Sequence, residues 1–216
     1  MTTNWQDYTA GLELTLEPSE CALLVIDVQD MFCFPTGVTG RKHANTRMQA
    51  LPGKINAFAD PFRRAGGLVV YIRALTDEAN RPAHMKWLDR VKGNYFPEDP
   101  DHNDYRFYGL SIPEDDIVLE KRCGDAFTST DLKELLDARS VRHVLVSGVR
   151  TEICVRRAAE RASSEGYVVF VLRDLCATRD ACGEHEDQAL MFLNAYSGLV
   201  TTSVEMTGWL EARVSG

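Results

Sequence analysis

Five short apolar segments constrain the fold of this 216-residue chain more than any other feature. Four are apolar along most of their length rather than at alternate positions, and the segment 116–122 has a shorter apolar run, I-V-L, followed by charged residues. Continuous apolar runs of this kind are typical of strands in a parallel sheet that is covered on both faces. The five predicted strands are residues 21–27, 68–74, 116–122, 143–149 and 167–174.

Segments with helical periodicity separate these strands, at residues 48–65, 130–138, 151–165 and 184–196. A sixth strand is predicted at 198–203 and a closing helix at 204–214. Because connections between parallel strands are right-handed, the helices should cover both faces of the sheet. We therefore predict an α/β fold, a three-layer α/β/α sandwich that is Rossmann-like, with about six mostly parallel strands in an order that stays open. Pro61 is expected to kink the first helix or end it early.

Size and charge restrict the domain organisation and the class of partner. With 44% apolar residues the chain can form one substantial core, so a single domain is predicted over residues 1–216. The net charge is −8, with acids and bases interspersed, which disfavours nucleic acid and anionic membranes as partners. The expected partner is a small molecule.

Neither the N-terminal residues nor the cysteines indicate an exported protein. No stretch approaches the roughly 20 apolar residues of a membrane span, and the N-terminal residues lack a basic region followed by an apolar one. We therefore expect a cytoplasmic protein. Its six cysteines should be reduced thiols, and without a C-x-x-C pair they predict neither a zinc ribbon nor a thioredoxin motif.

The segment at residues 75–114 does not fit the alternation of strands and helices. It contains N-R-P and G-N-Y-F-P-E-D-P, and only a short helix near residues 83–91 is predicted within it. Long loops inside compact domains are often lids or binding loops. We predict a lid or substrate loop here, with a surface insertion that has no role as the alternative.

Three reactive side chains follow three of the predicted strands: Asp27, Lys121 and Cys154. Ligands of an open α/β sheet bind beyond the carboxyl ends of the strands. With Thr151 as N-cap, Cys154 would lie in the first turn of a helix, where backbone NH groups lower a thiol pKa and hold an oxyanion. Asp27 would then be the base, and Lys121 would hold it in place. Each residue alone is more often structural, but the three together favour catalysis.

Four motifs carry a family resemblance: L-L-V-I-D-V-Q-D-M-F, V-L-E-K-R-C-G-D-A-F, V-S-G-V-R-T-E-I-C-V-R-R-A-A-E-R-A and H-E-D-Q-A-L. From about residue 20 to 212 the chain resembles the isochorismatase-like cysteine hydrolases. The resemblance implies a catalytic Asp-Lys-Cys triad at Asp27, Lys121 and Cys154. It also implies a cis peptide bond between Val149 and Arg150, an oxyanion hole formed by the backbone NH groups of Arg150 and Cys154, and a homodimer or homotetramer.

The family includes nicotinamidases, N-carbamoylsarcosine amidohydrolases and biuret-type hydrolases, as well as isochorismatase, which cleaves a vinyl ether. We therefore predict a cysteine-dependent amidohydrolase that cleaves a C–N bond of a small amide, ureido or carbamoyl compound through a thioester. The alternatives are an isochorismatase-type vinyl ether hydrolase and a non-catalytic binding protein on the same fold.

Departures from the family pattern concern substrate and metal. Arg150 stands where relatives usually carry a small residue, and its side chain is expected to face either the substrate or a subunit interface. Phe32 and Arg156, the first of two arginines after the nucleophile, are also predicted to bind substrate. Asp77-Glu78-Ala79 replaces the metal-binding Asp-x-His motif of nicotinamidases, so no metal and no cofactor are predicted.

Overall fold

The computed structural model describes residues 16–37, 39–40, 43–93 and 105–214, with side chains up to residue 208. Six parallel strands form one sheet in the order β3-β2-β1-β4-β5-β6. Every residue of β1 and β4 is buried, as their continuous apolar sequences require. The predicted fold class is confirmed. The strands are β1 (Cys21–Ile26), β2 (Leu68–Ala74), β3 (Ile117–Lys121), β4 (His143–Val149), β5 (Val168–Ala177) and β6 (Leu199–Thr201).

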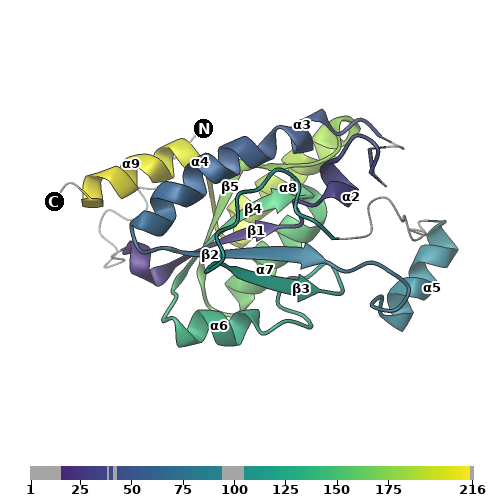
Figure 1. Ribbon diagram of the computed structural model, residues 1–216, viewed down its shortest axis with the longest axis horizontal. Coiled ribbons are helices and arrows are strands. Elements are labelled where there is room, and N and C mark those ends of the chain that lie inside the picture. Colours follow the sequence, from purple (N-terminus) through teal and green to yellow (C-terminus); the bar gives the residue numbers. More distant parts are fainter. Residues whose placement is uncertain (1–15, 38, 41–42, 94–104, 215–216) are drawn as a thin grey trace.

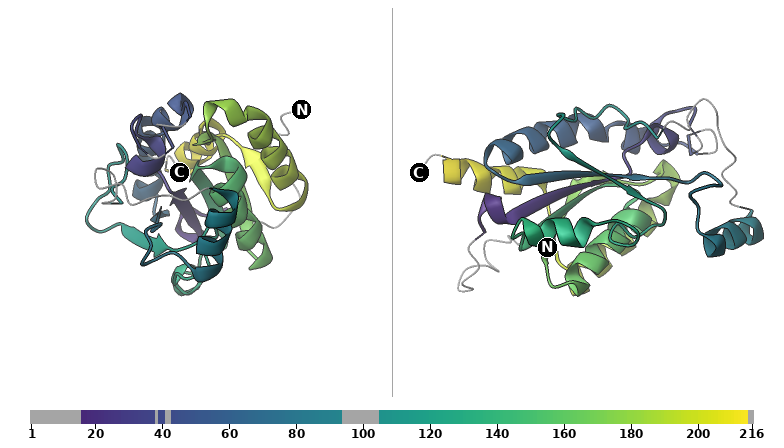
Figure 2. Two further views of the ribbon diagram at one scale, coloured as in Figure 1. Left: turned by 90° about the vertical axis from the view of Figure 1, so that its right-hand side faces the viewer. Right: turned by 60° about the horizontal axis from the view of Figure 1, so that its bottom comes forward.

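Helices cover both faces of the sheet (Figures 1 and 2). On one face lie α4 (Leu51–Arg64) and α9 (Ser203–Val214), and on the other lie α6 (Leu132–Ala138), α7 (Arg156–Ser164) and α8 (Gly183–Tyr196). Alternate residues of β1 pack on opposite faces of the sheet, since Leu23 lies in the core beside α4 and Leu24 in the core beside α7. The shorter elements are η1 (Pro18–Glu20), α2 (Asp30–Cys33), α3 (Thr46–Gln49), α5 (Ala83–Lys92), η2 (Thr151–Val155) and η3 (Asp180–Cys182).

The first predicted helix differs from the observed one, and two prolines account for the comparison. The segment 48–65 is divided into α3 and α4, because Pro52 occupies the first turn of α4, where its missing NH costs no hydrogen bond. Pro61, in contrast, does not end α4 early. It lies in the last turn, and the helix continues through Arg64, with Ala65 N donating to Pro61 O at 3.0 Å.

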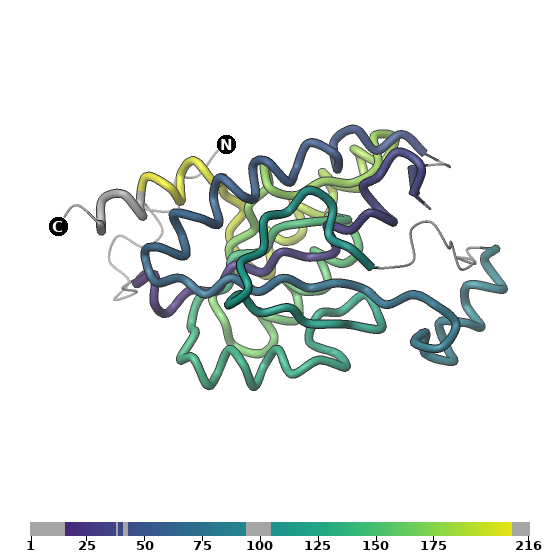
Figure 3. The backbone as a smooth tube through the Cα atoms, viewed as in Figure 1, coloured from purple at the N-terminus to yellow at the C-terminus, as the bar shows by residue number. Residues whose placement is uncertain are grey.

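The strand order determines where a ligand can bind. The chain builds outward from β1 to β3, returns to the centre, and then builds outward from β4 to β6 in the opposite direction (Figure 3). All six strands are parallel, so their carboxyl ends lie at one edge of the sheet. The order reverses between β1 and β4, and such a reversal opens a crevice at the carboxyl edge.

The segment 75–114 divides into parts with different environments. α5 stands away from the sheet (Figure 1), whereas Phe107, Tyr108 and Leu110 pack against the core beside α4. Residues 94–104 lie outside the described residues, so the predicted lid and the predicted single domain stay predictions. None of the helices in the described part of the chain combines the length and apolar character that a bilayer crossing requires.

At Gly148 the backbone of β4 lies close against that of β1, and this glycine provides a test of the packing. Its φ is +114°, and a Cβ there would lie 2.1 Å from the carbonyl oxygen of Ile26. Gly166 also has a positive φ, +93°, but a Cβ there would meet nothing within 4 Å. Gly166→Ala should therefore lower the free energy of unfolding by about 1–2 kcal/mol through backbone strain alone. Gly148→Ala should cost a further ~1–3 kcal/mol because of the clash.

Urea unfolding of the two variants and the parent measures this difference. Equal losses at the two glycines would contradict the close approach of β4 to β1.

Candidate active site

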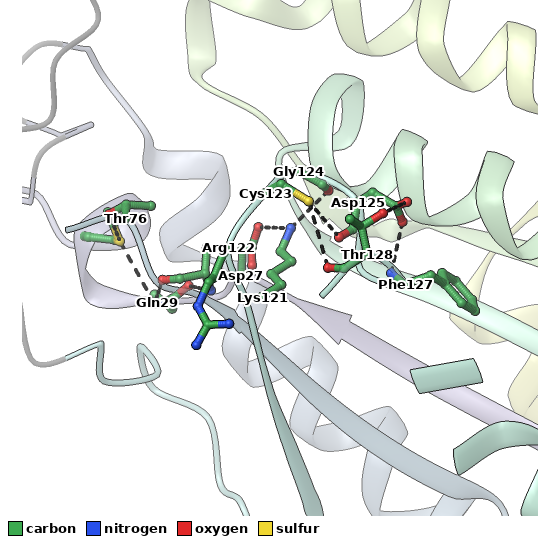
Figure 4. Close-up of polar contacts among 12 residues, drawn as sticks. Asp27, Gln29, Thr76, Lys121, Arg122, Cys123, Gly124, Asp125, Phe127 and Thr128 are labelled. Atoms are coloured by element: carbon green, nitrogen blue, oxygen red, sulfur yellow. Dashed lines mark hydrogen bonds and ion pairs between the residues drawn. The ribbon is translucent and has the colours of Figure 1, made fainter. Parts of the chain in front are cut away.

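Three of the predicted site residues lie at the carboxyl edge of the sheet. Asp27 directly follows β1, Lys121 is the last residue of β3, and Cys154 lies in η2, which follows β4. Although β2 separates β1 from β3, Lys121 Nζ is 2.9 Å from Asp27 Oδ2 (Figure 4). The β2 residue in register with Lys121 is Ala74, and its small side chain leaves the lysine room to cross β2.

The turn after β1 points the side chain of Asp27 toward Lys121. Asp27 has a left-handed backbone, with φ of 54°, and its NH donates to Ile72 O at 2.8 Å. Two residues later the buried Gln29 is bound to the end of β2: its amide oxygen accepts from Ala74 N at 2.8 Å, and its amide nitrogen donates to Ala74 O at 3.2 Å. The loop that carries the carboxylate is thus fixed to the strand that the lysine crosses.

Asp27 and Lys121 form an ion pair away from solvent, since both side chains are buried. Burial raises the pKa of Asp27 above its usual range, and Lys121 only partly offsets this effect. Burial would lower the pKa of Lys121, but the adjacent Asp27 and Cys154 raise it, so the ammonium stays charged. Nζ also donates to Gly124 O at 3.1 Å (Figure 4). Asp27 is consequently a stronger base than an exposed carboxylate.

Cys154 is partly exposed because it borders a cavity, yet its sulfur lies deep in the protein. Burial raises its pKa to about 12, with Asp27 adding to the increase and Lys121 opposing it. The predicted lowering of the thiol pKa is therefore wrong, because desolvation outweighs the favourable position at the start of a helix. The resting sulfur is a neutral thiol, and it needs a base to become a nucleophile.

The local structure around Cys154 differs from the predicted capped α-helix. Residues Thr151–Val155 form a π-helical turn, in which Val155 N donates to Arg150 O at 3.2 Å. Thr151 is not the N-cap: its hydroxyl donates to Glu186 Oε1 at 2.7 Å, and Arg47 pairs with Glu186 from α3. The flanking residue is Arg150, and the peptide bond between Val149 and Arg150 is cis. The α8 carboxylate of Glu186 thus positions the turn that carries the cysteine.

A cavity of about 370 Å³ lies in front of these residues, with Asp27 and Cys154 in its wall. Phe32 lines it, and its role in substrate binding stays a prediction. Arg150 also lines it, but its guanidinium is paired with Glu152, with Nη2 2.6 Å and Nε 3.0 Å from Oε1. That guanidinium therefore borders the cavity with its charge already balanced by a carboxylate.

Arg156 is not among the residues of the cavity wall. Its Nε donates to Glu160 Oε1 at 2.8 Å, and its guanidinium lies 4.5 Å from the ring centroid of Phe192. The prediction for Arg156 is corrected in favour of Arg157, which does line the cavity. Arg157 follows Cys154 by three residues and so lies on the same side of the helix, a spacing visible in the sequence. Arg81, Arg122 and Arg179 also line the cavity. Arg122 lies within the motif V-L-E-K-R-C-G-D-A-F, whereas Arg81 and Arg179 lie outside the four motifs.

In the segment that corresponds to the nicotinamidase metal motif, Asp77 accepts hydrogen bonds from neighbouring residues. Burial would raise the pKa of Asp77, but hydrogen bonds from Tyr105 and Asn80 lower it to about 2. The carboxylate also accepts from the backbone NH groups of Ala79 and Asn80 at 2.9 and 3.1 Å. Across the described ranges, no group of three or more His, Cys, Asp or Glu side chains is placed to hold a metal ion. These residues do not fit the metal site that the nicotinamidase relatives imply.

Comparison with known proteins identifies the family. Residues 21–205 match the profile of the Isochorismatase domain, so the chain belongs to the isochorismatase-like hydrolase family and the resemblance drawn from the motifs is confirmed. A cysteine hydrolase from Pseudomonas syringae pv. phaseolicola 1448A has a similar fold, with a TM-score of 0.79 and 23% identity over 93% of this chain and 96% of that one.

Two solved amidases are also similar. A pyrazinamidase from Pyrococcus horikoshii, in complex with zinc, has a TM-score of 0.71 and 27% identity over 85% of this chain and 99% of that one. An N-carbamoylsarcosine amidase from Thermoplasma acidophilum has a TM-score of 0.66 and 25% identity over 85% of this chain and 96% of that one.

The ammonium group next to Cys154 should make this thiol more reactive. Lys121 lowers the pKa of the thiol, against the increase that burial causes. Lys121→Met should therefore slow alkylation of Cys154 by neutral iodoacetamide at pH 8, by about tenfold for each unit by which the thiol pKa rises. Alkylation is followed by mass spectrometry of the Cys154 peptide, and circular dichroism checks that the variant is folded. An unchanged rate would show that the Lys121 charge does not act on the thiol.

Proposed function

We propose that this protein is a cysteine-dependent amidohydrolase that cleaves a C–N bond of a small amide, ureido or carbamoyl compound. The observation that carries the proposal is the contact of a buried carboxylate, Asp27, with a charged Lys121 beside the Cys154 thiol, at the wall of a cavity. This set provides a nucleophile, a base whose pKa is raised, and a fixed positive charge that keeps the base ionised.

In the first half of the reaction Asp27 takes the proton of the Cys154 thiol while the sulfur attacks the substrate carbonyl. The carbonyl double bond becomes a C–O single bond, and the backbone NH groups of Arg150 and Cys154 stabilise the resulting oxyanion. Asp27 then gives its proton to the leaving nitrogen as the C–N bond breaks. Ammonia or an amine departs, and a thioester remains on Cys154.

In the second half a water molecule attacks the thioester carbonyl, and Asp27 accepts its proton. Collapse of the tetrahedral intermediate breaks the C–S bond, and the proton on Asp27 returns to the sulfur. Lys121 remains protonated throughout, because Asp27 and Cys154 both raise its pKa. Its role is to position Asp27 and to balance the charge of that carboxylate.

The family and the cavity support a small substrate. Two of the similar solved structures are amidases by name, at 27% and 25% identity. A cavity of about 370 Å³ is at the lower end of the range for small-molecule sites. Phe32 lies in its wall and offers an apolar surface against which a planar amide can pack. The lid formed by residues 75–114 and the homodimer or homotetramer remain part of this proposal.

Cys154→Ala should abolish amide hydrolysis, with kcat lowered at least about 10³-fold, because the covalent path is removed while the cavity is retained. Ammonia release is measured over carbamoyl amino acids, biuret, maleamate and nicotinamide. Acid-quenched wild-type protein should show the added mass of an acyl group on Cys154. The matched control is Cys182→Ala, which removes a thiol outside the cavity wall and should keep wild-type turnover.

Near-normal turnover by Cys154→Ala would contradict the covalent mechanism. The same variant separates the alternative chemistries, since vinyl ether hydrolysis by Asp27 alone would survive it and would leave no acyl-enzyme. A wild-type protein that turns over no compound in the panel, and whose Cys154 resists alkylation, would indicate a binding protein instead.

A further inference from the structure

The wall of the cavity is rich in arginine, although the chain as a whole carries a net charge of −8. Two of the five cavity arginines are neutralised, since Arg81 Nε is 2.6 Å from Asp89 Oδ2 and Arg150 is paired with Glu152. The other three form no ion pair with any acid in the described part of the chain. They are Arg122, Arg157 and Arg179. The cavity therefore has an excess of positive charge.

Arg157 lies close to the ion pair of Asp27 and Lys121. A Cβ on Gly124 would lie 2.1 Å from Arg157 Nη1, so the guanidinium lies directly against the backbone of Gly124. The carbonyl oxygen of the same glycine accepts the hydrogen bond from Lys121 Nζ. One residue thus separates the Arg157 guanidinium from the ammonium that pairs with Asp27. Arg157 is also exposed, so a ligand in the cavity can reach it.

Arg179 provides a second, independent observation. Its Nε is buried but has no hydrogen-bond partner among the described residues. A buried donor without a partner destabilises the folded protein, and a ligand oxygen in the cavity would accept its hydrogen bond. The third member, Arg122, is exposed, and among the described residues its guanidinium makes only a long hydrogen bond of 3.4 Å, from Nε to Asn80 Oδ1. Each of the three guanidinium groups therefore has donors that form no hydrogen bond with the described residues.

We propose that the substrate is an amide that also carries a carboxylate, and that Arg157, together with Arg179, binds this group. The inference rests on the proposed amidohydrolase function and specifies its substrate class. Guanidinium is suited to this role, because its planar donors match the two oxygens of a carboxylate. Arg157 is then a specificity-determining residue, while the C–N bond is cleaved at Cys154.

The test compares an acid with its neutral methyl ester at the same amide. N-carbamoylglycine and maleamate are assayed against their methyl esters by ammonia release. Wild-type kcat/KM should favour each acid by at least about tenfold. Arg157→Met should lower kcat/KM for the acids about 10- to 100-fold, mainly through KM, and should change it less than about twofold for the esters.

The neighbouring arginine is the matched control. Arg156→Met removes an equal charge from the same helix, but Arg156 is outside the cavity wall and paired with Glu160. It should leave both acids and both esters at their wild-type rates. If Arg156→Met and Arg157→Met reduce the acid rates equally, the effect is one of general charge and the assignment to Arg157 is overturned.

Other outcomes separate this inference from the proposed function. Hydrolysis of esters and acids at equal rates would overturn the carboxylate site and leave the amidohydrolase intact. If no amide is hydrolysed, calorimetric titration of Cys154→Ala with N-carbamoylglycine and its ester decides the matter. Preference for the acid that is lost in Cys154→Ala combined with Arg157→Met supports the site, whereas weak or equal binding of the two ligands overturns it.

Discussion

The buried ion pair between Asp27 and Lys121 is the interaction on which the rest of the site depends. Each charge on its own would cost several kcal/mol to bury, so the two must stay together. Their contact at 2.9 Å joins the ends of β1 and β3 across β2, where the residue in register with Lys121 is the small Ala74. The pair also requires the left-handed turn at Asp27 and the bonds from Gln29 to β2 that hold it.

This pair is also central to the mechanism that we propose. A thiol with a pKa of about 12 is inert at neutral pH, and the adjacent carboxylate, whose pKa is raised, is the base in that proposal. Because the proposed proton transfer runs from sulfur to Asp27 within the pocket, the attack would not require a thiolate to persist there. The π-helical turn that holds Cys154 is itself supported from outside, since Thr151 is bound to Glu186 and Glu186 is paired with Arg47.

Much of the fold was predictable from the sequence because parallel strands that are buried on both faces read as continuous apolar runs. The bounds of β2 and β4 match the predicted residues 68–74 and 143–149. The meeting of Asp27 with Lys121 followed from the rule that strand ends share one edge. The strand order did not follow, because it depends on tertiary packing rather than on local pattern. The thiol pKa was predicted in the wrong direction because the depth of the sulfur is a property of the folded structure.

The positions of the cavity arginines likewise could not be predicted from the sequence. Arg156 and Arg157 are adjacent and chemically identical in the sequence, and only the orientation of α7 places the second toward the cavity and the first over Phe192. Arg81 and Arg179 come from segments that are almost 100 residues apart in the printed sequence and carry no shared motif. Their convergence is a result of the fold and was not visible before it.

The reversal of strand order between β1 and β4 means that the site is assembled from both halves of the sheet. Asp27 and Lys121 belong to the half of the sheet formed by β1, β2 and β3, whereas Cys154 follows β4 and belongs to the other half. Neither half contains both a base and a thiol from this set. Because the carboxylate and the thiol come from different halves, the site is complete only when the two halves are packed together, so the reactivity of the thiol depends on the assembled sheet.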